Sequence, residues 1–538
     1  MVKRIIGLSF ALFLGGAAAF GGHAKVAADL EGIDPASNID VIIQFKQVPT
    51  AAHHQKIHDK GGQHKRDLSV IKGGHYLVPA RALADLAQDP DVVSISPDRV
   101  VTGALDLAIK AINASVAQAH KFTGAGVGIA VLDSGISSPD LTGQVVYGES
   151  FVAGQDPKDT YEHGTHVATI VAGNGLKSQG KYMGVAPGAA IVNLKVLDGA
   201  GHGTDSAVIA AIQKAIVLKA AYNIRVMNLS LGRPVASSYK TDPLCQAVEA
   251  AWKAGIVVVV AAGNEGRNQS QNTDGYGTIT SPGNDPYVIT VGAMKTMATP
   301  SRDDDRIASY SSKGPTLLDH IVKPDLVAPG NRIVSAITDN DGNGGLDVQF
   351  PQNKVSGDYF ILSGTSMAEP MVSGAAALLL QKYPALTPDQ VKARLMRTAT
   401  KTFPAYSTAT DPMTGISYTS QYDVFTIGAG YLDVWAALND TSAVTGTALS
   451  PTVSLSQTSN TVSLVFANGV VWGSGVVWGS GVVWGSGVLA GSGVVWGSGV
   501  VWGTGNVSGT GVVWGSGVVW GAGTPAGEAA AIAINGEN

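Results

Sequence analysis

The chain has 538 residues, too many for one hydrophobic core, so we expect two or three domains. Only 14 % of its residues are charged and its formal net charge is −5, which argues against nucleic acid as a partner. Its single cysteine, Cys245, excludes an intrachain disulfide and a metal site built on cysteines, and we interpret it as a small buried apolar residue.

The N-terminal segment has the order of a secretory signal peptide. Lys3 and Arg4 precede an apolar stretch at 5–20, and small residues follow, so we assign residues 1–24 to the signal. The stretch is short for a membrane span, although an uncleaved anchor is the alternative. We therefore predict a secreted, extracellular protein and leave association with the cell surface open.

Residues 37–101 have the pattern of a small α+β domain. Residues 39–45 partly alternate as a strand, 80–87 contain helix formers, and 91–96 have the pattern of a closing strand. Five histidines cluster here, and we interpret them as solvated surface residues rather than metal ligands: His53, His54, His58, His64 and His75.

Residues 105–440 alternate strands and helices, which predicts an α/β fold with a mostly parallel sheet and helices on both faces. A helical run covers residues 206–222. The predicted strands lie at 127–133, 190–197, 226–232 and 256–262, and the segments 286–293 and 323–330 continue the pattern.

Four polar residues stand at the ends of these elements. Asp133 ends an apolar strand, His163 opens a helix of small residues, and Asn264 follows a fully apolar strand. Ser366 precedes an Ala/Leu-rich helix, and Pro370 fits that helix only in its first turn. A helix N-terminus favours an anion, such as the oxyanion that a serine nucleophile generates.

The segments around these four residues resemble the subtilisin-like serine peptidases. The order Asp, His, Ser is that of subtilisin and differs from the orders of chymotrypsin and the α/β-hydrolases. The resemblance covers about residues 105–440 and implies a serine endopeptidase that works through an acyl-enzyme. It implies that Ser366 is the nucleophile and that His163 is its base. Asp133 would orient the imidazole, and Asn264 would donate to the oxyanion.

The same resemblance predicts the substrate groove. The edge strand to which a substrate backbone adds resembles Ser230, Leu231 and Gly232. The opposite strand resembles the segment with Gly201 and Gly203. The primary pocket would be lined by Ala261 and Gly263, small residues that tolerate large apolar side chains. The resemblance implies no cofactor for the chemistry, and it makes His166 a structural residue.

The end of the first domain, residues 89–100, resembles the end of subtilisin propeptides. It implies that residues 37–101 are an inhibitory propeptide that assists folding, covers the groove and is cut off. The chain would then be a self-inhibited precursor, and a pH-sensing role of the histidines in release is a hypothesis.

Two departures from the family pattern concern the site. Glu369 and Met371 follow the nucleophile where a small residue and a histidine are usual, and we interpret Glu369 as a first-turn residue that stabilises the helix dipole. Segment 173–181 lacks an Asn-rich calcium loop, so structural calcium is an open question. Residues 303–305 and 339–343 carry oxygen ligands, but we interpret both as solvated turns.

The C-terminal part repeats Val-Val-Trp-Gly-Ser-Gly between residues 470 and 523, and seven of the nine tryptophans lie there. We assign 441–468 to a linker, 469–523 to the repeat and 524–538 to a final tail. The repeat predicts brief strands in a stacked array, with exposed Trp that contact a cell surface or polysaccharide. A Gly-rich, poorly ordered extension is the alternative.

The sequence as a whole predicts a secreted serine endopeptidase that acts on proteins or peptides. The alternative is an adhesive or structural surface protein in which the tail carries the function. The presence of Asp133, His163 and Ser366 together argues against that alternative.

Overall fold

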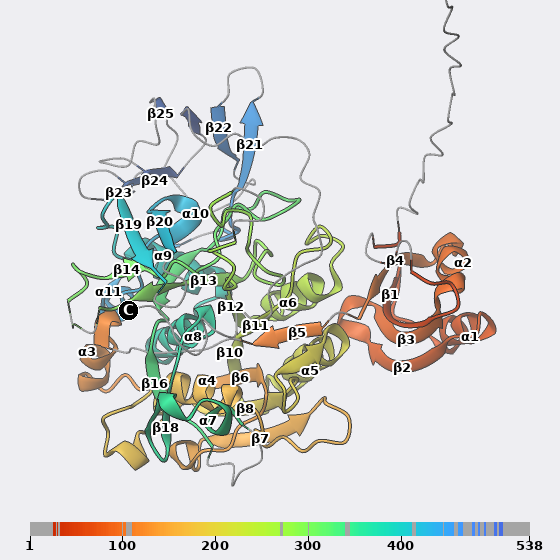
Figure 1. Ribbon diagram of the computed structural model, residues 1–538, viewed down its shortest axis with the longest axis horizontal. Helices are drawn as coiled ribbons and strands as arrows, with labels where there is room; N and C mark the ends of the chain where they lie inside the picture. The colour runs from red at the N-terminus through yellow and green to blue at the C-terminus, as the bar shows by residue number, and fades with distance from the viewer. Residues whose placement is uncertain are drawn as a thin grey trace, which may run out of the picture.

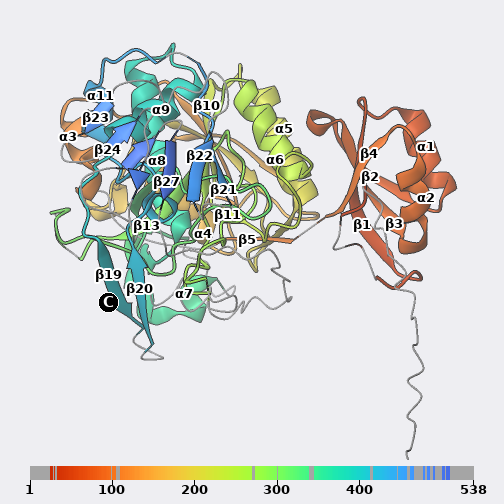
Figure 2. The same cartoon turned by 90° about the horizontal axis from the view of Figure 1, so that it is seen from above.

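The structure is a computed structural model. It describes residues 25–454 except 28–29, 31–32, 99, 104–109, 269–272, 298, 300, 339–344, 412–415 and 445, and several short strands beyond. The predicted signal segment lies outside the described residues. A small N-terminal domain stands beside a larger domain that holds the long sheet (Figures 1 and 2). Among the described residues, no helix is long and apolar enough to cross a membrane.

The N-terminal domain is a four-stranded antiparallel sheet with two helices on one face. The strand order is β2-β3-β1-β4. The elements are β1 (Asn38–Phe45), α1 (Ala51–Asp59), β2 (Gln63–Leu68), β3 (Gly73–Pro79), α2 (Leu83–Gln88) and β4 (Val92–Pro97). Alternation along β1 divides its side chains between two cores. Val41, Ile43 and Phe45 pack inside the domain, whereas Ile42 joins the core of the large domain.

The large domain is built on an eight-stranded sheet in the order β14-β13-β12-β10-β6-β8-β7, with β15 beside β13. All pairs are parallel except β13 with β14. The strands are β6 (Gly128–Asp133), β7 (Val145–Ser150), β8 (Ala190–Lys195), β10 (Ile224–Leu229), β12 (Val257–Ala261), β13 (Ile289–Lys295), β14 (Arg306–Ile307) and β15 (Leu326–Pro329). The predicted mostly parallel sheet is confirmed.

Helices pack on this sheet in two pairs. α4 (His163–Ala172) and α8 (Thr365–Lys382) pack together, while α5 (Asp205–Leu218) and α6 (Pro243–Lys253) form the second pair. The second pair faces the N-terminal domain (Figure 2), where α5 contacts β2. Because the sheet lies between helices, a central strand such as β12 is buried along its whole length, which explains its unbroken apolar sequence.

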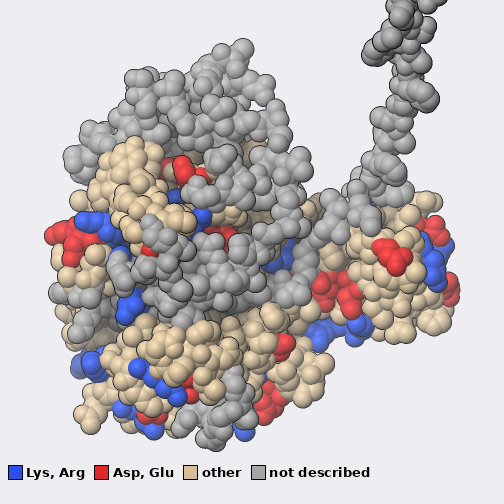
Figure 3. All heavy atoms as spheres, viewed as in Figure 1, with Lys and Arg blue, Asp and Glu red and all other residues tan. Residues whose placement is uncertain are grey.

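The surface carries both signs of charge. On the face shown in Figure 3, Lys and Arg are interspersed with Asp and Glu over both domains. Beyond residue 454, short strands β23 (Val476–Trp478), β24 (Val482–Trp484) and β26 (Val500–Trp502) coincide with Val-Val-Trp units. The stacked repeat array itself stays a prediction, as does its ligand.

Candidate active site

Asp133 and His163 meet at the carboxyl end of the sheet. β6 ends at Asp133, and α4 begins at His163. Nδ1 of His163 lies 2.6 Å from Oδ1 of Asp133, and both side chains are buried. A carboxylate in this place keeps the imidazole proton on Nδ1, so that Nε2 can accept a proton from a nucleophile. The pair therefore has the geometry of an oriented general base.

Gly164 permits this close approach. A Cβ on Gly164 would lie 2.3 Å from the carbonyl oxygen of Gly135 and 3.0 Å from Cβ of Asp133. Only glycine lets the first turn of α4 come so near the end of β6. The residue before His163, Glu162, is buried with a φ of 81°, and burial raises its pKa to about 8. Its Oε2 accepts from the Asp347 backbone N–H at 2.8 Å.

Ser366 lies in the first turn of α8, where several backbone N–H groups have no helical acceptor. Its Oγ donates to the carbonyl oxygen of Ser230 at 3.2 Å. The side chain is buried, with 2 % of its surface exposed. The helix terminus therefore surrounds Ser366 with main-chain donors, as predicted from the sequence.

Pro370 lies in the second turn of α8, so the expectation of a first-turn proline is wrong. A proline at this position lacks the N–H that would bond to the carbonyl four residues earlier, which is that of Ser366. The hydroxyl of Ser230 donates to the Ser366 carbonyl at 2.9 Å instead. A side chain from another element thus replaces the missing helical donor.

Glu369 is not a first-turn charge, and that interpretation is also wrong. α8 has no acidic residue in its first turn, and Glu369 is fully buried. Burial raises the pKa of Glu369 well above its usual range. Its Oε1 accepts from Ser373 Oγ at 2.8 Å, and its Oε2 lies 2.7 Å from Ser230 Oγ. Since the single proton of Ser230 serves the Ser366 carbonyl, a protonated Glu369 completes the network by donating to Ser230.

Asn264 follows β12 and contacts the start of α8. Its Oδ1 accepts from the Thr365 backbone N–H at 2.9 Å and from Thr365 Oγ1 at 3.2 Å. These bonds orient the amide, because its oxygen is engaged next to Ser366. The amide nitrogen is the group of Asn264 that can donate to an oxyanion.

The predicted groove segments lie on either side of another part of the same chain. β5 (Val100–Gly103) is the middle strand of a three-stranded sheet, antiparallel to β11 (Leu231–Gly232) and β9 (His202–Thr204). In the register, Gly103 is opposite Leu231, Thr102 is opposite Gly232, and Val101 is opposite Gly203. β5 therefore occupies the position of an extended peptide between the two predicted walls.

The remaining predicted groove residues have distinct positions. Ser230 precedes β11 and is fully buried, so its side chain serves Ser366 and Glu369. Gly201 has a φ of 78°, and a Cβ there would lie 2.5 Å from the Tyr161 ring. Ala261 ends β12. Gly263 has a φ of 104°, and its N–H donates to Thr365 Oγ1 at 3.1 Å.

His166 lies one turn after His163 in α4 and is enclosed by the protein. It is fully buried, and its Nε2 donates to the Phe360 carbonyl at 3.2 Å. Burial lowers the pKa of His166 to about 3, so the ring is neutral. This environment is that of a structural histidine.

The N-terminal histidines do not form one cluster. His53 is buried and bonds to Thr50, so the solvated-surface interpretation is wrong for this residue. His75 Nε2 lies 2.7 Å from Asp40 Oδ1. His54 and His64 lie together, with Nε2 atoms 3.4 and 3.0 Å from Asp67 Oδ1. Desolvation lowers the pKa of His54, so the neutral form of this ring is favoured beside Asp67.

The acidic segments considered for calcium are only partly described. Asp304 accepts from Thr299 Oγ1 at 2.8 Å. Asp305 is buried, which raises its pKa to about 6, so the solvated-turn interpretation is wrong at this position. Residues 339–343 lie outside the described residues. In the segment 173–181, the Lys177 backbone N–H donates to Asp140 Oδ1 at 2.9 Å.

Three comparisons relate the chain to known proteins. Residues 124–430 match the profile of the Subtilase family. Serine protease AprX of Bacillus subtilis is 40 % identical over 329 residues, which are 59 % of this chain and 71 % of AprX. Subtilisin E of the same organism is 35 % identical over 409 residues, 74 % of this chain and 94 % of subtilisin E.

A solved structure gives the same fold. Fervidolysin from Fervidobacterium pennivorans, a keratinolytic enzyme related to subtilisin, has a TM-score of 0.58 over 83 % of this chain and 68 % of its own, at 23 % identity. The solved structure shows the α/β fold, and the family profile and the two relatives define the class as a serine peptidase. The chain belongs to the subtilase family and is a serine endopeptidase.

Proposed function

We propose that the chain is a secreted endopeptidase, made as a self-inhibited precursor, that cleaves proteins with Asp133, His163 and Ser366. The observation that carries the proposal is the 2.6 Å contact between Asp133 and His163 at the same end of the sheet as the N-terminus of α8. Export rests on the predicted signal segment, and surface contact rests on the predicted repeat.

The chemistry follows from these positions. Ser366 Oγ attacks the carbonyl carbon of the scissile bond while its proton passes to Nε2 of His163. Asp133 stabilises the resulting imidazolium, which then gives the proton to the leaving amine. The Asn264 amide and the Ser366 backbone N–H donate to the oxyanion. Water, with His163 again as base, hydrolyses the acyl-enzyme and frees Ser366.

The N-terminal domain acts as the inhibitor in this proposal. β5, at the end of the domain, lies between β11 and β9 in the manner of β-strand addition. Two contacts between the N-terminal domain and α5 support the position of this domain. The Ser206 backbone N–H donates to Asp98 Oδ1 at 2.6 Å, and the Val70 N–H donates to Gln213 Oε1 at 3.1 Å. We expect maturation to cut the chain after Gly103, within residues 104–109.

The proposed substrates are proteins bound as extended strands. β11 and β9 recognise backbone groups, so affinity would depend weakly on side chains other than the one in the primary pocket. The small residues Ala261 and Gly263 would admit large apolar side chains there. Casein, which is unstructured and rich in such residues, is a suitable probe.

The test compares the full precursor with Ser366→Ala over time, by mass and by casein hydrolysis. We expect the wild type to shorten by about the mass of the first hundred residues and to become active, while the variant stays whole and inert. If the variant processes itself and degrades casein like the wild type, the assignment of Ser366 is wrong. If neither is cut but the wild type is active, the inhibitor role of the first domain is wrong.

A further inference from the structure

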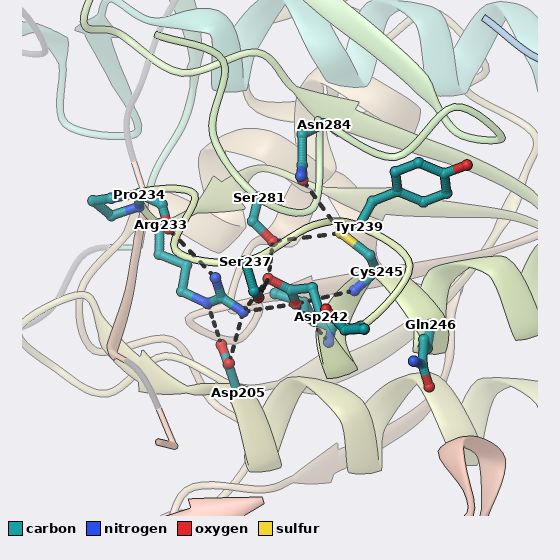
Figure 4. Close-up of polar contacts among 12 residues, drawn as sticks. Asp205, Arg233, Pro234, Ser237, Tyr239, Asp242, Cys245, Gln246, Ser281 and Asn284 are labelled. Atoms are coloured by element: carbon teal, nitrogen blue, oxygen red, sulfur yellow. Dashed lines mark hydrogen bonds and ion pairs between the residues drawn. The ribbon is translucent and has the colours of Figure 1, made fainter. Parts of the chain in front are cut away.

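A buried ion-pair group joins the residues that directly follow the two walls of the proposed groove. Nε and Nη2 of Arg233 donate to the two carboxylate oxygens of Asp205 at 2.8 and 2.9 Å. The same Nη2 donates to Oδ1 and Oδ2 of Asp242 at 2.8 and 2.9 Å (Figure 4). The side chain of Arg233 is 1 % exposed, and both carboxylates are 0 % exposed.

The chain positions of these residues connect them to the groove. Arg233 directly follows β11, and Asp205 directly follows β9. β11 and β9 each pair with β5, which lies between them. When β5 is absent, that shared main-chain partner is lost, whereas the contact between Arg233 and Asp205 still joins the ends of the two walls.

We propose that Arg233 is a positioning residue that, through Asp205, sets the separation of β11 and β9 for an extended substrate. This inference rests on the proposed function, because it concerns the groove that receives the substrate. Arg233 does not touch the reacting atoms and acts only through the two walls.

The surroundings hold the guanidinium in one place. The Arg233 backbone pairs with Ser281, with N–H to carbonyl distances of 3.0 and 2.8 Å in the two directions. Asp242 caps α6 by accepting from the Leu244 backbone N–H at 3.0 Å. Asp205 is the first residue of α5. Both carboxylates therefore sit at helix N-termini, where the helix dipole favours a negative charge.

Geometry is a better explanation of this group than stability. Taking an arginine and two aspartates out of water is costly, and apolar residues of the same volume often stabilise a protein as well as a buried ion pair does. The ion-pair group fixes the orientation of Arg233 relative to Asp205, because the planar guanidinium can bond both oxygens of Asp205 only in one orientation. A groove that adds a strand to both walls needs such a fixed spacing.

The test uses two substrates of different length. An acetyl ester contacts the nucleophile and the oxyanion site, whereas a tetrapeptide anilide also spans β11 and β9. In Asp205→Asn, we expect the KM for the tetrapeptide to rise about tenfold, the kcat to change less than threefold and ester hydrolysis to stay unchanged. A tenfold change corresponds to about 1.4 kcal/mol, the size of one lost charged hydrogen bond.

Asp242→Asn is the matched control. It makes the same chemical change against the same arginine, but Asp242 is the N-cap of α6 and does not follow a groove strand. We expect Asp242→Asn to lower the thermal midpoint by about as much as Asp205→Asn does, and to raise the tetrapeptide KM less than threefold. Equal KM changes in the two variants would overturn the inference, as would an unchanged KM in Asp205→Asn.

Arg233→Lys keeps a cation but loses the planar double contact, so we expect an intermediate rise in KM. If Asp205→Asn does not mature, Arg233→Lys serves as the test variant. Equal losses of activity of Arg233→Lys on the ester and on the tetrapeptide would then show a folding defect and contradict the inference. Failure of the proposed function gives a different result, since Ser366→Ala would then hydrolyse both substrates like the wild type.

Discussion

The hydroxyl of Ser230 donates to the carbonyl oxygen of Ser366 at 2.9 Å, where a regular helix would place a backbone N–H. Pro370 removes that N–H, and Ser230 lies on the chain just before the groove strand β11. The Ser230 side chain therefore connects the first turn of α8 to a wall of the groove, and Glu369 hydrogen-bonds to the same side chain.

Ser230→Ala should weaken this connection. It removes one hydrogen bond from the Ser366 carbonyl and one from Oε2 of Glu369, which costs about 0.5–1.5 kcal/mol of unfolding free energy for each bond. We also expect a lower kcat, because the first turn of α8 loses its anchor. Ser373→Ala is the control, since it also removes a contact to Glu369, at 2.8 Å, but none to Ser366. Denaturant unfolding and tetrapeptide kinetics measure both effects. A kcat loss as large in Ser373→Ala would contradict the prediction.

Glu369 gives the enzyme a pH-dependent stability with a defined sign. Because burial raises its pKa, the folded chain keeps the proton where the unfolded chain, with a pKa of about 4.3, releases it. Its contribution to stability therefore falls as the pH rises from about 4.3 to the folded-state pKa. Glu369→Gln stays neutral and should lack this loss.

The measurement is the difference in thermal midpoint between wild type and Glu369→Gln at several pH values. We expect the thermal midpoint of the wild type to fall relative to that of Glu369→Gln as the pH rises from 5 toward 9. Asp285→Asn is a positive control for the method, because burial raises the pKa of Asp285 to about 8. A difference that does not change with pH would mean that Glu369 is ionised in the folded protein.

Gly164→Ala tests the close approach of α4 to β6. The new Cβ would meet the Gly135 carbonyl and Asp133, so we expect a loss of about 1–3 kcal/mol of stability and a misplaced His163. Gly357→Ala is the control, because a Cβ at that position meets nothing within 4 Å. Casein hydrolysis and thermal unfolding of the two variants should differ clearly. Full activity in Gly164→Ala would contradict the geometry.

The sequence predicted the central parallel strands well because they are buried on both sides, as in the unbroken apolar run of β12. It missed the parallel strand β7, none of whose residues is buried. It missed β2, whose sequence Gln63–Leu68 is almost wholly polar because most of its side chains are exposed. It also misplaced Pro370 and Glu369 within α8. Their roles depend on Ser230, which lies 136 residues from Ser366 in the chain, so local patterns carry no sign of the contact.

The buried ion-pair group was missed for the same reason. Arg233, Asp205 and Asp242 each read as ordinary polar residues of loops and helix starts, and only the fold brings them together. The signal that could have found them is position: an arginine directly after a predicted groove strand, and an acidic residue directly after the opposite one.

The last prediction separates the two polar ends of the Asn264 amide. Asn264→Asp keeps an oxygen that can accept from Thr365, at 2.9 Å in the wild type, but removes the N–H donor for the oxyanion. We expect kcat to fall by about 10²–10³ with little change in KM, as when an oxyanion donor is lost in a related enzyme. Thr365→Val is the companion variant, since it removes the hydroxyl contact at 3.2 Å and leaves the Asn264 donor in place. A smaller kcat loss in Asn264→Asp than in Thr365→Val would show that Asn264 supports α8 and does not bind the oxyanion.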